Sequence, residues 1–264
     1  MLAAASAGEI DSDAALVGVM ASMSPAQLRD LLAAGPERAT PWLLAAAECG
    51  LVEAQLALGR MRLQGAHRDE AKAHAWFSRA AEAGSAEAWN MLGRCCEHGW
   101  GAPIDAAAAA RWYAKAAEAG DAWAQYNLGH LYLNGQGVER NAGQALASYR
   151  RAAEQGHDRA MNLVGRCCEQ GWGVEPDAVA AGDWYRRSAE GGYFRGQFNY
   201  ASLLAAEGRI AEALGWFEQA LQGAPPDSRR VMCDVLAASP QPDLRALAGP
   251  SGAMANDRLS ARVD

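Results

Sequence analysis

Residues 85–120 read SAEAWNMLGRCCEHGWGAPIDAAAAARWYAKAAEAG, residues 121–156 read DAWAQYNLGHLYLNGQGVERNAGQALASYRRAAEQG, and residues 157–192 read HDRAMNLVGRCCEQGWGVEPDAVAAGDWYRRSAEGG. Each of these blocks has 36 residues. On either side, residues 51–84 form the same unit with a shorter loop, and residues 193–223 form a fifth copy shortened in its central loop. Self-similarity at a period of this length is typical of a repeat architecture.

Each block predicts two antiparallel helices. In the first half, Ala88 and Leu92 lie four residues apart, which places them on one helical face. In the second half, Ala109 and Trp112 form the inner stripe of another helix. One hairpin cannot bury its apolar faces alone, whereas stacked copies can. We therefore predict an all-α fold, a right-handed α-solenoid of about eleven to thirteen helices.

Turn residues mark the ends of the predicted helices. The GxG loop of the third copy, Gly135 and Gly137, breaks the chain between the two helices. Asx side chains accept hydrogen bonds from the free N–H groups of a first helical turn. Such residues stand before four of the second helices: Asp69, Asp105, Asn141 and Asp177. Closing glycines suited to a left-handed position end five segments: Gly50, Gly84, Gly120, Gly156 and Gly192.

The string A-x-x-x-L-G-x-x-Y-x-x-G-x-G-V, followed by D/N-x-x-x-A and W-Y-x-x-A-A-x-x-G, resembles the Sel1-like repeat, a relative of the tetratricopeptide repeat. The resemblance covers residues 51–192 strongly and residues 193–223 more loosely. Cys96 and Cys168 stand where that family has Tyr, as Tyr132 does here. The fifth copy lacks the glycine loop and is closer to an ordinary tetratricopeptide unit.

The segments outside the repeats receive their own predictions. We expect a weak helix or flexible chain over residues 1–23, and a capping helical pair over 24–50, made of 25–34 and 41–50. After the repeats at 51–84, 85–120, 121–156, 157–192 and 193–223, we expect a C-terminal capping helix within residues 224–238. Residues 239–264 are rich in Pro, Gly, Ser and Ala and are predicted to be a mobile tail.

Charge and hydropathy exclude two classes of partner. The 264-residue chain has a formal net charge of −7, whereas nucleic-acid binding rests on cationic surface. No apolar run reaches the roughly 18 residues that a membrane-spanning helix needs. We therefore expect neither a nucleic acid nor a membrane as partner.

The cysteines and the N-terminus bear on the compartment. Four of the six cysteines form vicinal pairs, and neighbouring cysteines rarely bridge each other. No basic residue precedes Arg29, so the basic region of a secretory signal is missing. We expect reduced thiols and a cytoplasmic location. Heavy use of Arg and Ala indicates a bacterial, GC-rich genome.

Resemblance to the Sel1-like family implies a non-catalytic scaffold or adaptor that binds a protein or peptide along the concave face of its first helices. The residues on that stripe are Asn90, Arg94, His98, Tyr126, His130, Asn134, Asn162, Arg166 and Gln170. Related tetratricopeptide domains clamp a peptide carboxylate with concave Asn and Lys or Arg. By resemblance, Asn90 with Arg94, and Asn162 with Arg166, would clamp an acidic tail. Alternatively, these arginines pair with Glu97, Glu169 or Glu87.

A longer period joins two of the copies. Blocks 85–120 and 157–192 match at 19 of 36 positions and share GRCCE-x-GWG. Trp100 and Trp172 therefore occupy equivalent glycine loops. Tryptophan is enriched at binding hot spots, but a loop tryptophan equally covers the neighbouring repeat. Packing is the interpretation that we favour.

The cysteine pairs offer a second function, that of a metal- or redox-responsive accessory protein. The pairs are Cys95 with Cys96 and Cys167 with Cys168. Structural zinc prefers cysteines two to four residues apart, and adjacent cysteines on a helix point in different directions. Buried cysteine is an ordinary small core residue, so we favour a core role and predict no bound metal.

No catalytic pattern stands out. The chain has no GxSxG, HExxH, P-loop or dinucleotide fingerprint. The sequence therefore predicts no enzyme activity and no cofactor.

Overall fold

The computed structural model describes residues 36–64 and 68–249, and every regular element within them is an α-helix. These residues form thirteen helices, α4 to α16, and no strand. The predicted all-α class is confirmed, with the packed helix pairs typical of an α-solenoid. Three predictions, the segment 1–23, the helix at 25–34 and the tail beyond residue 249, lie outside the described residues.

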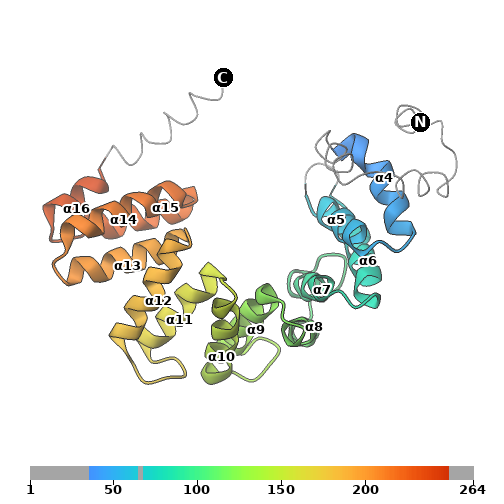
Figure 1. The fold of residues 1–264 in the computed structure, drawn as a ribbon, viewed down its shortest axis with the longest axis horizontal. Helices are drawn as coiled ribbons and strands as arrows, with labels where there is room; N and C mark the ends of the chain where they lie inside the picture. Colours follow the sequence, from blue (N-terminus) through green and yellow to red (C-terminus); the bar gives the residue numbers. More distant parts are fainter. Residues whose placement is uncertain (1–35, 65–67, 250–264) are drawn as a thin grey trace. The chain divides into compact units, whose positions relative to one another are not determined.

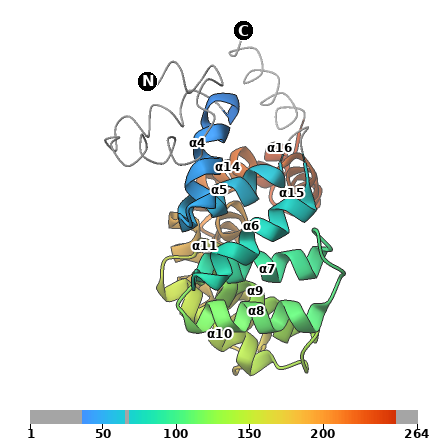
Figure 2. The same cartoon turned by 90° about the vertical axis from the view of Figure 1, so that its right-hand side faces the viewer.

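The chain divides into two compact units. The first holds the described residues up to Ala124, together with Gly135–Glu139. Its helices are α4 (Pro36–Glu48), α5 (Val52–Arg62), α6 (Glu70–Glu82), α7 (Ala86–His98) and α8 (Ala106–Glu118). Each of these helices packs on the next one along the chain (Figures 1 and 2).

The second unit holds residues 125–134 and the chain from residue 140 onward. Its helices are most of α9 (Ala122–Asn134), then α10 (Ala142–Glu154), α11 (Asp158–Gln170), α12 (Ala178–Glu190), α13 (Phe194–Ala206), α14 (Ile210–Gly223), α15 (Pro226–Ala237) and α16 (Pro242–Leu247). Consecutive helices pack from α10 to α14, and α16 closes the end against α14 and α15 (Figure 1).

The predicted helix caps are present. Asp105 Oδ1 accepts a hydrogen bond from the Ala108 backbone N–H at 2.9 Å. Asp69, Asn141 and Asp177 cap their helices in the same way. Left-handed backbone, with φ between +86° and +93°, recurs at the closing glycines, as their positions predict: Gly50, Gly84, Gly120, Gly156 and Gly192.

The repeat glycine lets the two helices of each pair approach closely. A Cβ atom on Gly93 would lie 2.5 Å from a ring carbon of Tyr113, which is fully buried. The same contact recurs between three other glycines and rings: Gly59 with Phe77, Gly129 with Tyr149, and Gly165 with Tyr185. Any side chain at these positions would push the aromatic ring out of the core.

The termini of the repeat array depart from the predictions. Helix α4 begins at Pro36, five residues before the expected start at 41, and continues through Pro41. Within the predicted mobile tail, residues 242–247 form helix α16 instead. Proline at the first turn favours this helix, and Leu244 is buried against Leu236 and its neighbours. The tail prediction is therefore wrong for this segment.

Candidate functional site

The two asparagines of the predicted clamp are not at the surface. Asn90 on α7 is 6% exposed and Asn162 on α11 is 3% exposed. Asn162 Oδ1 accepts a hydrogen bond of 2.8 Å from the side chain of Asn199 on α13. The expectation that Asn90 and Asn162 line an open groove is corrected, because neighbouring structure covers both side chains.

The two arginines of the clamp each meet the tryptophan of the following glycine loop. The guanidinium carbon of Arg94 lies 5.0 Å from the ring centroid of Trp100. The corresponding distance from Arg166 to Trp172 is 5.1 Å. Both arginines sit in the middle of a first helix, and the left-handed glycine at its end turns the loop tryptophan back toward them. The period that joins blocks 85–120 and 157–192 is thus repeated in the structure as well as in the sequence.

The carboxylates that were alternative partners of these arginines are used elsewhere. Tyr113 donates a hydrogen bond of 2.6 Å from its hydroxyl to Glu97. Tyr185 donates the equivalent bond, of 3.0 Å, to Glu169. Arg94 and Arg166 make no ion pair within the described part of the chain, so the pairing alternative is wrong for both of them.

Glu87, the third carboxylate offered as a partner of Arg94 or Arg166, pairs with a different arginine. Arg60 on α5 pairs with Glu87 at the start of α7. Both side chains are nearly half exposed, so this pair is screened by water and contributes little to stability. The contrast separates Arg60 from the arginines beside the tryptophans.

One further polar residue completes each of these constellations. The exposed His98 ring lies 4.7 Å from the Trp100 ring, and in the fourth copy, residues 157–192, the exposed Gln170 occupies the same position. We name two Arg–Trp platforms: the first is Arg94, His98 and Trp100, and the second is Arg166, Gln170 and Trp172. Each platform belongs to a single unit.

The loop tryptophans also pack, as favoured from the sequence. Trp100 is half-buried and contacts the core cluster that includes Phe77 and Cys95. Trp172 is half-buried as well. Their remaining exposed surface is what a partner can reach.

The intervening repeat carries aromatic and imidazole groups at the same positions. Tyr126 stacks on His157, with ring centroids 4.9 Å apart, and meets His130 edge-on at 4.6 Å. His130 in turn lies edge-on to Tyr149 at 5.5 Å. Both Tyr126 and His130 are half-buried, while Asn134 at the end of α9 is exposed. These side chains mainly hold one another in place.

The cysteine pairs lie in the core. Exposed fractions are at most 7% at all four positions: Cys95, Cys96, Cys167 and Cys168. Burial raises the pKa of Cys95 to about 12 and that of Cys167 to about 11. Both thiols are therefore protonated at neutral pH and are poor nucleophiles and metal ligands. In the described residues, no group of His, Cys, Asp or Glu is arranged to hold a metal ion.

Sequence reasoning missed the bonds from Tyr113 to Glu97 and from Tyr185 to Glu169. A signal for them exists in the repeat. Glu occurs three residues after the arginine only in the copies that also have a loop tryptophan, and the middle copy has Leu133 there. Residues that change together between copies are candidates for contact.

Comparison with known proteins places this geometry in a family. The family model of the Sel1 repeat matches residues 52–85, 86–121, 124–157 and 158–193. These four matches cover more than half of the chain. The chain belongs to the Sel1 repeat family. Sel1 repeats generally form non-catalytic modules for protein–protein interaction.

Solved Sel1 repeat structures resemble this chain. A Sel1 repeat protein from Oxalobacter formigenes aligns with a TM-score of 0.74 and 26% identity, over 90% of this chain and 99% of that one. A protective antigen of uropathogenic Escherichia coli with an SLR fold aligns at 0.68 and 28% identity, over 96% of this chain. This Sel1 chain spans 56% of the antigen's length.

A more distant structure shares the fold alone. It is an immunity protein from Pseudomonas aeruginosa, with a TM-score of 0.57 and 16% identity over 81% of this chain and 83% of that one. No curated protein matched the sequence. Within the residues described for this Sel1 protein, no helix is long and apolar enough to cross a membrane.

Proposed function

We propose that this Sel1 repeat protein is a non-catalytic scaffold that binds a polypeptide carrying acidic residues, and that its two Arg–Trp platforms make the contacts. The observation that carries this proposal is the recurrence of the same stack in two repeats, with Arg94 and Arg166 engaged by rings and not by carboxylates.

The chemistry of the stack suits carboxylate recognition. A guanidinium is planar, always charged, and presents N–H groups in a fork that matches a carboxylate. Stacking on an indole orients that plane and reduces the rotamer freedom that binding would otherwise remove. Because Asn90 and Asn162 are buried, recognition in this proposal rests on the arginine forks together with His98 and Gln170.

The negative charge of the rest of the protein favours binding of an acidic segment at the platforms over binding elsewhere on the surface. The protein has a net charge of −7, and each platform arginine has a glutamate close to it, Glu97 near His98 and Glu169 bonded to Gln170, so the two guanidinium groups would select where an acidic segment lands. Extension of the contact along the first-helix face, and the cytoplasmic setting expected from the cysteines, stay predictions.

The test is quantitative capture from the native cell extract with three forms of the full chain. The forms are the wild type, the Arg94→Glu/Arg166→Glu variant, and a matched Arg111→Glu/Arg150→Glu variant that reverses one exposed arginine in each unit. We expect the platform variant to lose at least about tenfold of the captured partner, since charge-assisted bonds are replaced by repulsion. Equal capture by the platform and control variants would contradict the proposal.

A further inference from the structure

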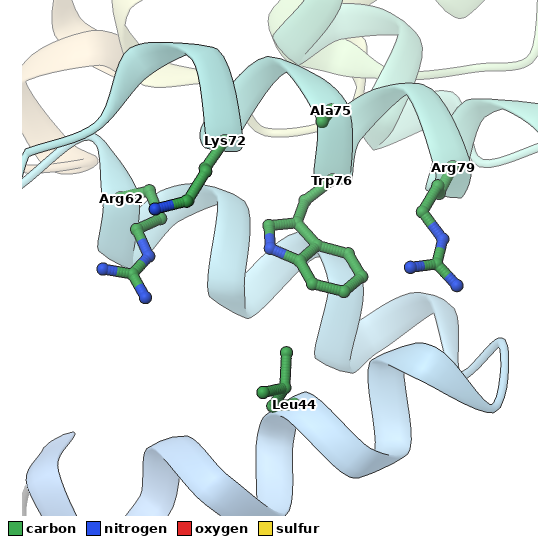
Figure 3. Close-up of a pocket in the computed structure, with 6 residues that line it drawn as sticks. All are labelled: Leu44, Arg62, Lys72, Ala75, Trp76 and Arg79. Atoms are coloured by element: carbon green, nitrogen blue, oxygen red, sulfur yellow. The ribbon is translucent and has the colours of Figure 1, made fainter.

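A pocket of about 380 Å³ lies in the first unit and shares no lining residue with the Arg–Trp platforms. It opens between helices α4 and α6, beside the C-terminal end of α5. Its walls are formed by Leu44, Arg62, Lys72, Ala75, Trp76 and Arg79. Figure 3 shows Trp76 and Leu44 facing each other at the centre, with Arg62 and Lys72 toward one end and Arg79 toward the other.

Three of the six lining residues are cationic and none is a carboxylate, and the surface that these residues give the pocket is mostly apolar, made of carbon atoms of the side chains. Arg79 stacks on Trp76 at 4.8 Å and pairs with Glu48 at 2.9 Å, outside the lining. Lys72 pairs with its helix cap Asp69 at 2.9 Å. These side chains are between a third and two thirds exposed, so water screens both pairs and an incoming carboxylate can share the cations.

Arg62 adds a third positive charge to the pocket, and it interacts electrostatically with Asp69, the carboxylate that also pairs with Lys72. It makes no ion pair with any residue that the structure describes. Its side chain comes from the last turn of α5, where it lies toward Lys72 (Figure 3). Among the described residues, three cations thus line one apolar centre with two carboxylates nearby, which leaves a local excess of one positive charge in an acidic protein.

Three of the lining residues are departures from the repeat. Where this copy has Arg62, the following copies have Cys96, Tyr132 and Cys168. Where it has Lys72, they have Ala108, Gln144 and Ala180. Leu44, half exposed on α4, occupies the position of Ser78, Ala114, Arg150 and Arg186. The fold forms without these three side chains elsewhere, so packing does not explain their presence here.

The remaining wall recurs in two later repeats and not in the third copy, which has Ser148 at the tryptophan position. The pair formed by Trp76 and Arg79 recurs as Trp112 with Lys115 and as Trp184 with Arg187. Three of the repeats therefore provide an aromatic–cation surface at this position. In the first copy, Arg62 and Lys72 add two cations to it, and Leu44 of α4 adds an apolar side chain. Those additions turn a generic surface into a pocket with its own chemistry.

We propose that this pocket binds an extended segment of a partner polypeptide with the pattern acidic–x–apolar–x–acidic. The apolar side chain enters between Trp76 and Leu44. One flanking carboxylate meets Arg62 and Lys72, and the other meets Arg79. This site lies beyond the Arg–Trp platforms and does not depend on them.

The spacing of the pocket fits this pattern. Lys72 and Arg79 are seven residues apart on α6, a rise of about 10 Å, and their long side chains reach further. In an extended chain alternate side chains share one face, and residues i and i+4 lie about 13 Å apart. An acidic residue at each of these positions, with an apolar residue midway, places three matching groups on one face.

The experiment measures binding of a fluorescent peptide, Gly-Glu-Ser-Leu-Ser-Glu-Gly, to the full chain by anisotropy. Two control peptides replace both Glu by Gln, or the Leu by Ser. We expect the acidic–apolar peptide to bind most tightly, and its affinity to fall with added salt because exposed charges are screened. Failure to bind at millimolar protein and low salt, or equal binding of the glutamine peptide, would overturn the proposal.

Variants of the pocket residues test whether the peptide binds there. Arg62→Gln/Lys72→Ala should weaken the peptide about fivefold to tenfold, and Leu44→Ser should weaken it less. Since other copies tolerate small or neutral residues at these positions, both variants should keep the wild-type melting temperature. The Arg60→Gln/Lys115→Ala variant removes two charges from the same unit and should bind normally.

The platform variant separates the two sites. Arg94→Glu/Arg166→Glu should bind the probe peptide as the wild type does, whatever the outcome of the capture experiment. Loss of peptide binding in the platform variant, with binding retained by Arg62→Gln/Lys72→Ala, would place the peptide on the platforms and overturn the pocket assignment.

Discussion

The repeat at 121–156 and its two neighbours, 85–120 and 157–192, solve the same packing problem differently. All three bury a tyrosine against the repeat glycine. In the neighbours, the hydroxyls of Tyr113 and Tyr185 donate to glutamates. In the middle copy, the Tyr149 hydroxyl is buried and finds no hydrogen-bond partner among the described residues. Aromatic packing from Tyr126 and His130 covers that ring instead.

This difference shows that several residues of the first helix and its loop change together between the middle copy and its neighbours. The neighbours share Asn, Arg, Glu and Trp along the first helix and its loop, whereas the middle copy has Tyr126, His130, Leu133 and Gln136 at those positions. Glu97 and Glu169 anchor a tyrosine, which leaves the nearby arginine to stack on tryptophan. Without the glutamate and the tryptophan, an imidazole replaces the guanidinium. A polar, solvent-accessible surface and a self-packed aromatic one are thus alternatives on one framework.

The largest effect is expected from filling the repeat glycine. Gly93→Ala would place a methyl group 2.5 Å from the Tyr113 ring, and we expect a loss of about 1–3 kcal/mol in the free energy of unfolding. Gly129→Ala should cost less, because the Tyr149 hydroxyl holds no bond that resists a shift of the ring. Urea denaturation measures both variants. A smaller loss for Gly93→Ala than for Gly129→Ala would contradict the idea that the glutamate fixes the ring.

Next in size is the removal of a glutamate acceptor. Glu97→Leu gives the second repeat the residue of the middle copy and leaves the Tyr113 hydroxyl buried without its partner, at a cost of about 1–3 kcal/mol. Thermal denaturation checks this value, with the exposed Glu118→Leu as the control variant. If both substitutions lowered the melting temperature equally, the hydrogen bond from Tyr113 to Glu97 would contribute no more to stability than an exposed glutamate does.

Removing the hydroxyl group should have a smaller effect on stability, and its sign should differ between Tyr113 and Tyr149. Tyr113→Phe removes a bonded hydroxyl and should destabilise the protein by about 1 kcal/mol. Tyr149→Phe removes a buried hydroxyl that has no hydrogen-bond partner, and should be neutral or stabilise by up to about 1 kcal/mol. Chemical denaturation of the two variants side by side gives the comparison. Destabilisation by Tyr149→Phe as large as that by Tyr113→Phe would show that the two hydroxyls are equivalent.

The smallest effect concerns pH. His157 caps α11 through Nδ1, which accepts the Ala160 N–H at 3.1 Å, where the second repeat uses Ser85. Burial lowers the pKa of His157 in the folded state, so the unfolded state binds the proton more readily. Its contribution to stability is therefore complete above the unfolded pKa, near pH 6.5, and is lost as pH falls below it.

The variant that tests this effect is His157→Ser, which keeps a capping side chain but removes the titrating group. Melting temperatures measured from neutral to mildly acidic pH should fall less for the variant than for the wild type. The remaining dependence includes His74, whose pKa burial also lowers. Parallel curves for the two proteins would exclude His157 as a pH-dependent cap.

The fold was predictable because the residues that mark helix starts and helix ends recur at the same positions in several repeats. Asp105 and its equivalents mark helix starts, and glycines such as Gly120 mark helix ends. The burial of Asn162 was not predictable, because helical spacing tells which residues share a face and not whether Asn199 on a later helix covers it. Helix α16 was missed because a short Pro- and Ala-containing segment gains its stability from burying Leu244, a tertiary effect.

Half of the candidate site could be read from the sequence. The arginines of the platforms were identified by their helical spacing and the tryptophans by their recurrence, but their contact depends on the left-handed turn at the helix end. The pocket between α4 and α6 was overlooked, although Arg62 and Lys72 break the repeat pattern in the printed sequence. Departures from a repeat carry information that its shared residues do not.

The most direct measurement on the platforms is site-specific photocrosslinking in the native cells. A photoreactive amino acid replaces the exposed His98 in one protein and Gln170 in another, with Arg111 and Arg150 as control positions. Illumination should join a partner polypeptide to the chain from positions 98 and 170 and not from the controls. Adducts that arise only from positions 111 and 150 would contradict the assignment of the Arg–Trp platforms as the partner-binding surface.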